Sequence, residues 1–220
     1  RGILNQELSH RPDQNGAILK FEEGELLFDF KRRFVDYKRP QLPFKDPARL
    51  KKILETYNAH YILAGRVHTG DTRMAGILSE ILDTVNSDDF LRSHVHYIAD
   101  YDEKLAYALS VGSNIAINVP IVGLEACGTS WEKDVANLNL LISTHDGGVA
   151  DGSTDSYLSV RGLGEEEEVL ELYARMEEGA LAWQNSFDLE VLIQKQLKEF
   201  LPIVSGSRML YDYLDYLLPE

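Results

Sequence analysis

The chain has 220 residues, of which 44% are hydrophobic and 26% charged, and so can bury the core of one domain or a small pair. Its 36 acidic residues against 22 basic ones give a net charge of −14. Such a surface repels nucleic acid and anionic lipid, so neither is expected as a partner, and any anion site must be a local basic patch.

The single cysteine excludes an internal disulfide framework and favours a reducing compartment, with the cytoplasm as the default. No run of 18 apolar residues is present, so no membrane span is expected, and no leader is recognised at the amino end. The sequence begins at Arg1 without an initiating methionine, and we expect it to be cut from something longer.

Short apolar runs alternate with amphipathic ones along the chain, which is typical of β-α-β units. Apolar runs predict five strands, at residues 25–30, 61–65, 94–99, 115–119 and 139–143. Helical spacing lies between them, at residues 46–58, 71–82 and 102–109. The pattern predicts an α/β fold with a doubly wound, mostly parallel, Rossmann-like sheet.

The last third of the sequence reads as helical. Residues 150–156 predict a loop, the acidic run 165–168 suits a helix start, and residues 205–218 form a last amphipathic segment. We therefore expect three parts: an N-terminal helical or linker remnant (1–24), the Rossmann-like domain (25–160), and C-terminal helices that pack on it (161–220).

Residues 31–39 hold five basic side chains directly after the first predicted strand: Lys31, Arg32, Arg33, Lys38 and Arg39. Guanidinium forks match phosphate oxygens, and an ammonium adds a point charge. On so acidic a chain this segment predicts a local anion site. The alternative is a solvated basic loop that only pairs with the acid excess.

Residues 125–133 place a carboxylate, a small-residue turn, two hydroxyls and a lysine where a strand meets a helix. Ligands of open α/β sheets bind at the carboxyl ends of the strands, so this is the expected site of chemistry. Gly128, Thr129 and Ser130 would start the helix and offer free amides to an anion. Lys133 lies one turn further, where it is either a ligand or a plain surface residue.

The remaining candidates carry weaker signals. His68 lies in a loop before Asp71, which can cap the next helix, and His68 either contacts a substrate or only caps. His94 and His96 share one strand face without a third ligand, so no metal site is predicted. Cys127 has no base partner in the sequence and is expected to be a small packed residue.

Taken in order, these segments resemble the carboxyl-terminal domain of the glycogen and α-glucan (maltodextrin) phosphorylases, which have the GT-B glycosyltransferase fold. That family carries Arg-Arg-Phe-x-x-Tyr-Lys-Arg, matched by residues 32–39, and an Ala-Gly-Lys-Ala-His-Pro-x-Asp stretch, matched loosely by residues 64–71. It also carries Tyr-Asp-x-x-Leu-Ala, at residues 101–106, and Leu-Glu-Ala-Ser-Gly-Thr-Ser-Gly-Met-Lys, in frame with residues 124–133.

The resemblance implies roles for the matched residues. Lys133 corresponds to the lysine that forms a Schiff base with pyridoxal phosphate. Around that cofactor stand Thr129, Ser130, Arg32 and Tyr37, and Arg33 and Lys38 correspond to the ligands of the substrate phosphate. Glu125, Ala126, Cys127, Gly128 and His68 are implied on the sugar side.

The family's reaction uses the cofactor's phosphate to exchange a proton with inorganic phosphate. That phosphate takes the terminal α-1,4 glucosyl unit and leaves as glucose 1-phosphate. The resemblance thus implies α-glucan and phosphate as partners. The glucan site and part of the cofactor pocket belong to an amino-terminal GT-B domain that lies outside this sequence. We therefore expect this fragment alone to be inactive, and a homodimer is possible.

The sequence departs from the family beside the lysine, where Trp131 and Glu132 replace Gly-Met and Asp134 replaces a small or apolar residue. Two carboxylates beside Lys133 would favour its charged form, whereas a Schiff base needs the free amine. Trp131 adds bulk where glycine would let the backbone approach a phosphate.

Two other functions stay open. One is a nucleotide-sugar transferase such as a glycogen synthase, whose motif has two glutamates eight residues apart; position 133 is lysine here. The other is a non-catalytic glucan-binding or regulatory remnant without cofactor, and it rests on the substitutions around Lys133.

Overall fold

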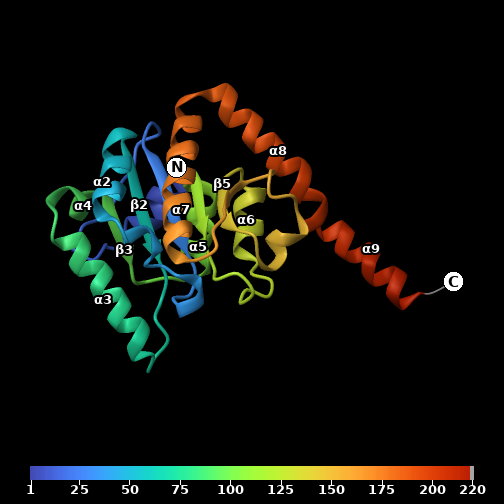
Figure 1. The fold of residues 1–220 in the computed structure, drawn as a ribbon, viewed down its shortest axis with the longest axis horizontal. Coiled ribbons are helices and arrows are strands. Elements are labelled where there is room, and N and C mark those ends of the chain that lie inside the picture. The colour runs from blue at the N-terminus through green and yellow to red at the C-terminus, as the bar shows by residue number, and fades with distance from the viewer. Residues whose placement is uncertain (219–220) are drawn as a thin grey trace.

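The computed structural model describes residues 1–218. Its centre is one parallel sheet of six strands in the order β3-β2-β1-β4-β5-β6 (Figure 1). The strands are β1 (Leu26–Lys31), β2 (Ala59–Ala64), β3 (Val95–Ile98), β4 (Ile115–Asn118), β5 (Leu140–Thr144) and β6 (Leu158–Val160). The predicted doubly wound parallel sheet is confirmed.

Helices cover both faces of this sheet. They are α1 (Gly2–Leu8), α2 (Pro47–Thr56), α3 (Thr72–Asn86), α4 (Asp89–His94), α5 (Glu103–Gly112), α6 (Ser130–Ala136), α7 (Glu165–Gln184), α8 (Ser186–Val204) and α9 (Gly206–Leu217). Short 3₁₀ turns are η1 (Asp36–Lys38), η2 (Leu42–Phe44) and η3 (Gly147–Asp151). Among the described residues no helix is long and apolar enough to cross a membrane.

The alternation of side chains along β1 explains the two layers. Leu26, Phe28 and Phe30 point into a core built with α2, α3, α4 and α7. Leu27 points the other way, into a second core built with α1 and α5. A third, smaller cluster joins α6 to α8 through Trp131 and Phe200.

The five predicted strands are confirmed, with ends that differ by one or two residues. The sixth, β6, was not predicted because it is only three residues long and follows a loop. Each predicted helix forms, and the acidic run 165–168 fills the first turn of α7. α1 packs on α5, and the three-part division of the chain stays a prediction.

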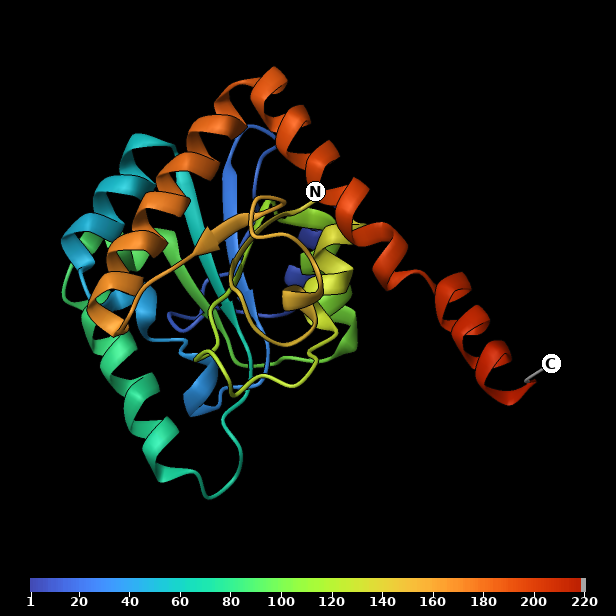
Figure 2. The ribbon, with the colours of Figure 1, turned by 45° about the vertical axis from the view of Figure 1, so that its right-hand side comes forward.

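The last helix stands apart from the sheet. α8 runs along the edge of the sheet domain, and α9 continues outward from it (Figures 1 and 2). No residue of α9 is buried, although one of its faces is apolar. The predicted amphipathic segment is therefore present and without a protein partner among residues 1–218.

The order of strands reverses between β1 and β4. Such a switch point opens a crevice at the carboxyl ends of the two strands. β1 ends at Lys31, directly before the basic segment, and β4 ends at Asn118, directly before the segment that contains residues 125–133. The topology thus brings the two segments singled out in the sequence to one edge of the sheet.

Candidate functional site

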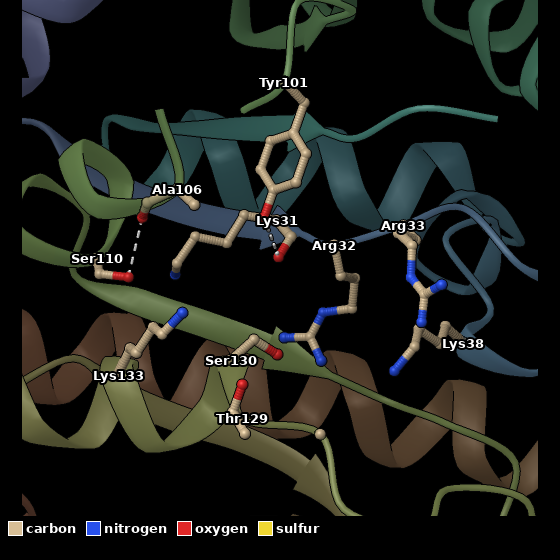
Figure 3. A pocket seen from close by; sticks show the side chains of 11 residues that line it. Lys31, Arg32, Arg33, Lys38, Tyr101, Ala106, Ser110, Thr129, Ser130 and Lys133 are labelled. Carbon is tan, nitrogen blue, oxygen red and sulfur yellow. Dashed lines mark hydrogen bonds between the residues drawn. The ribbon is translucent and has the colours of Figure 1, made fainter. Parts of the chain in front are cut away.

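A cavity of about 240 Å³ lies at this switch point. Figure 3 shows side chains from the segment after β1 facing those of α6 across it. The cavity is lined by Lys31, Arg32, Arg33, Lys38, Tyr101, Ala106, Ser110, Gly128, Thr129, Ser130 and Lys133. Five of these side chains are basic, so a local cationic site exists on a strongly acidic protein.

Arg32 is the central cation of the cavity. It is only 5% exposed, and its Nη1 donates to Oδ1 of Asn118, the last residue of β4. Its Nε and Nη2 are buried and have no hydrogen-bond partner among residues 1–218. Buried guanidinium nitrogens without acceptors carry a desolvation cost, and an anion in the cavity would satisfy them.

Arg33 and Lys133 line the cavity from opposite sides. Arg33 is exposed and makes no ion pair in the described part of the chain, and it also lines a neighbouring cavity of about 390 Å³. The Lys133 side chain makes no hydrogen bond or ion pair within residues 1–218, and its amine points into the cavity (Figure 3). Both cations are available to a ligand.

Lys31 has a different role from its neighbours. Its ammonium is buried, 2.9 Å from each carboxylate oxygen of Asp29, and it forms an ion pair with Asp134 of α6. Burial alone would lower the pKa of Lys31, but Asp134 and Asp29 outweigh it and raise that pKa. Burial also raises the pKa of Asp29, although Lys31 opposes this. Lys31 is therefore held by core acids.

Arg39 at the other end of the basic segment is likewise structural. It is buried, forms an ion pair with Glu168 of α7, and donates to the carbonyls of Val119 at 2.8 Å and Pro120 at 3.1 Å. Lys31 and Arg39 thus fit the alternative prediction, in which the basic residues of this segment only pair with acids. The predicted anion site therefore rests on the basic residues between Lys31 and Arg39.

The segment after β4 is held by Asp146. Its Oδ2 accepts the backbone N–H groups of Gly123 at 3.0 Å and Glu125 at 2.9 Å. Burial would raise the pKa of Asp146, but hydrogen bonds from these and neighbouring amides lower it overall. Gly147 packs beneath the segment, since a Cβ there would lie 2.9 Å from Cγ of Glu125. Glu125 in turn forms an ion pair with Lys38.

Two expectations about the neighbours of Lys133 are wrong. Asp134 turns into the core toward Lys31 and does not pair with Lys133. Trp131 is 2% exposed and packs edge-on against Phe200, with ring centroids 5.1 Å apart, so its bulk lies outside the cavity. Glu132 is the one carboxylate left beside Lys133; burial raises its pKa, and the lysine charge opposes the shift.

Several candidates lie outside the cavity lining. The Tyr37 ring faces Lys38 at 5.1 Å, and the Tyr37 carbonyl accepts the Ile121 amide at 2.7 Å. His68 lines the neighbouring cavity beside Arg33, and its Nδ1 lies 2.9 Å from the Thr69 carbonyl.

Ala126 and Cys127 are exposed and do not belong to the cavity lining. The expectation that Cys127 is packed inside is therefore wrong.

Sequence reasoning missed four residues at this site. Tyr101 and Ser110 line the cavity, Asn118 holds Arg32, and Asp146 fixes the segment after β4. Tyr101 carried a signal as part of the Tyr-Asp motif, and Asn118 carried one as part of an Asn-x-Pro pattern with Pro120. The others act through contacts between residues far apart in the sequence.

Curated proteins with similar sequences include glycogen and maltodextrin phosphorylases. Glycogen phosphorylase of Aquifex aeolicus is 30% identical over 218 residues, covering 90% of this chain and 30% of that protein. Maltodextrin phosphorylase of Thermococcus litoralis is 26% identical over 233 aligned positions, covering 97% of this chain and 27% of that protein.

This chain is related to the glycogen and maltodextrin phosphorylases. The resemblance seen in the sequence motifs is thereby confirmed. The chain spans about 30% of the length of the Aquifex phosphorylase, so the relation concerns only that part of the relative. No protein-family model matches the chain.

The fold has a counterpart among solved structures. The catalytic domain of starch synthase IV from Arabidopsis thaliana, bound to ADP and acarbose, superposes with a TM-score of 0.66 at 16% identity. The match covers 97% of this chain and 41% of that one. At this identity the likeness concerns the fold, and it confirms the GT-B glycosyltransferase architecture with a helical C-terminal region.

Proposed function

We propose that this chain carries the cofactor and phosphate sites of an α-glucan phosphorylase, which transfers glucosyl units from α-1,4-glucan to inorganic phosphate and yields glucose 1-phosphate. The observation that carries the proposal is the convergence of Arg32, Arg33, Lys38, Thr129 and Lys133 on one cavity. The relation to glycogen and maltodextrin phosphorylases supports it.

The residues around the cavity fit pyridoxal phosphate. Lys133 offers an amine without a competing protein partner among residues 1–218, and Thr129 and Ser130 offer two hydroxyls within the same cavity. Arg32 offers two buried nitrogens that lack acceptors. Trp131 packs against Phe200 on the opposite side of α6.

Each group has a defined task in this proposal. Lys133 anchors the cofactor, while Thr129, Ser130 and Arg32 hold its phosphate, with Tyr37 behind Lys38. When bound, pyridoxal phosphate supplies a phosphate group that can exchange a proton with the substrate phosphate.

In this proposal Arg33 and Lys38 hold the substrate phosphate. Two phosphates repel strongly at short range, and the fixed cations offset this repulsion.

The sugar side is formed by the segment after β4. Glu125 can accept hydrogen bonds from glucose hydroxyls, with the backbone of Ala126, Cys127 and Gly128 beside it. His68 reaches the neighbouring cavity. A further GT-B domain closes over this site in the proposed enzyme. The chain by itself is therefore inactive, and α9 offers an apolar face to a second domain or a second copy.

Trapping of the cofactor tests the proposal. Protein that contains this chain is incubated with pyridoxal phosphate, reduced with borohydride, digested and analysed by mass spectrometry. A pyridoxyl group on Lys133 is expected, and exposed Lys104 of α5 serves as the internal control.

Active protein with an unmodified Lys133 would contradict the proposal. ADP-glucose-dependent transfer by that protein would favour the glycogen synthase alternative. Glucan binding without either activity would favour the cofactor-free remnant.

A further inference from the structure

The ammonium of Lys38 is already occupied by a protein carboxylate. Lys38 and Glu125 form an ion pair in which each side chain is only 9% exposed. Arg33 and Lys133 have no such partner among residues 1–218, and Arg32 has two unpartnered nitrogens. Lys31 is held by the core acids Asp29 and Asp134, and Lys38 is neutralised by Glu125.

The two residues of this pair come from different strand ends. Lys38 follows β1 and ends the η1 turn, whereas Glu125 belongs to the segment after β4. Asp146 fixes the backbone of that segment through the amides of Gly123 and Glu125. A rotation of the Glu125 side chain is therefore enough to break the pair while the backbone stays in place.

An anion in the cavity would compete with Glu125 for Lys38. A substrate phosphate that contacts Arg33 also lies near Lys38, because both side chains line the same cavity. A dianion between two cations gains more than a single carboxylate gains from one. After the exchange the Glu125 carboxylate is a free acceptor beside Lys38, and a largely buried carboxylate without a donor is costly.

We propose that Glu125 acts as an internal anion that holds Lys38 until phosphate replaces it, and that this exchange releases the Glu125 carboxylate to accept sugar hydroxyls. This inference rests on the proposed function, because it assigns phosphate to the same cavity. Its consequence is positive coupling: phosphate tightens the binding of a hydroxyl-bearing ligand, and that ligand tightens the binding of phosphate by the same factor.

Calorimetry of the 220-residue chain with inorganic phosphate, at constant ionic strength, tests the exchange. Glu125→Gln removes the competing charge and is expected to bind phosphate about 5- to 50-fold more tightly than the wild type, within the usual range of such coupling. Glu132→Gln is the matched control, because Glu132 is a half-buried carboxylate that does not contact Lys38. Its phosphate affinity is expected to change less than about twofold.

A second measurement adds glucose to the phosphate titrations of the wild type and of Glu125→Gln. Saturating glucose is expected to tighten phosphate binding to the wild type about fivefold and to leave Glu125→Gln unchanged. Equal phosphate affinity of the wild type and Glu125→Gln, or no effect of glucose on the wild type, would overturn the exchange while the phosphate site stands. Absence of phosphate binding in both proteins would overturn the phosphate site as well.

Discussion

Lys31 and Asp134 form an ion pair beneath the cavity that ties the end of β1 to the middle of α6. Asp29 contacts the same ammonium from the other side, and the Ser113 hydroxyl donates to Asp29. The pair fixes the rotation of α6 about its axis. Asp134 therefore faces the core, and Lys133, one residue earlier, faces the cavity.

Loss of Lys31 should destabilise the fold strongly. Lys31→Met leaves Asp29 and Asp134 buried without a cation, and breaking such a pair costs about 3–5 kcal/mol. Urea unfolding followed by circular dichroism measures the change. Lys45→Met is the control, since Lys45 is about half exposed in its pair with Glu165 and should change stability by less than about 1 kcal/mol. Equal effects of both substitutions would contradict a structural role for Lys31.

Arg32 should dominate the affinity for anions. Arg32→Met removes the two buried nitrogens without partners and is expected to weaken phosphate binding about tenfold or more, as for the loss of a charged hydrogen bond. Calorimetry with inorganic phosphate provides the measurement. Arg92→Met, on α4 and outside the cavity, should leave the affinity unchanged; a similar loss in both variants would indicate only a general effect of net charge.

Trp131 should matter for stability and not for ligand binding. Trp131→Ala empties a buried site against Phe200 and is expected to cost about 3–5 kcal/mol, whereas Trp131→Phe should cost less because most of the packing is kept. Chemical unfolding and phosphate titration are measured on both variants. Tighter phosphate binding by Trp131→Phe at unchanged stability would show that the indole obstructs the cavity.

His60 should make the protein sensitive to acid. Burial, and then the charges of His96, His94 and Arg1, lowers its pKa to about 3 from 6.5. Between these values the unfolded chain binds a proton that the folded chain does not. The free energy of unfolding therefore falls as the pH drops from about 6.5 toward 3.

His60→Gln should reduce this decline, as measured by urea midpoints at pH 7 and pH 4.5. Exposed His10 supplies the control, because His10→Gln should keep the wild-type slope. An unchanged slope in His60→Gln would assign the acid sensitivity to other groups.

The sequence predicts the sheet well because its signals are local. The apolar runs of β1, β2 and β4 stand out against amphipathic helices, and Asp71 and Asp102 each cap a helix as side-chain acceptors. β6 was not predicted because three residues are too few for a periodic pattern. Its place in the sheet is set by packing under α7.

The candidate site was likewise predictable from the sequence only in part. Arg32, Arg33, Lys38 and Lys133 follow from motif order, and the topology brings them together. The partners of charged residues do not follow from the sequence. Asp134 lies next to Lys133 in the chain yet pairs with Lys31, because α6 turns it toward the core. Which acid neutralises which base depends on geometry across the sheet.

The most direct test of the account is whether a tetrahedral anion occupies the cavity. Crystals of this chain soaked in selenate and measured at the selenium absorption edge would locate such an anion by its anomalous signal. We expect a peak between Arg32, Arg33 and the Thr129 side of the cavity, with Glu125 turned away from Lys38. Selenate found only on surface lysines, with the cavity empty and the Lys38–Glu125 pair intact, would contradict it.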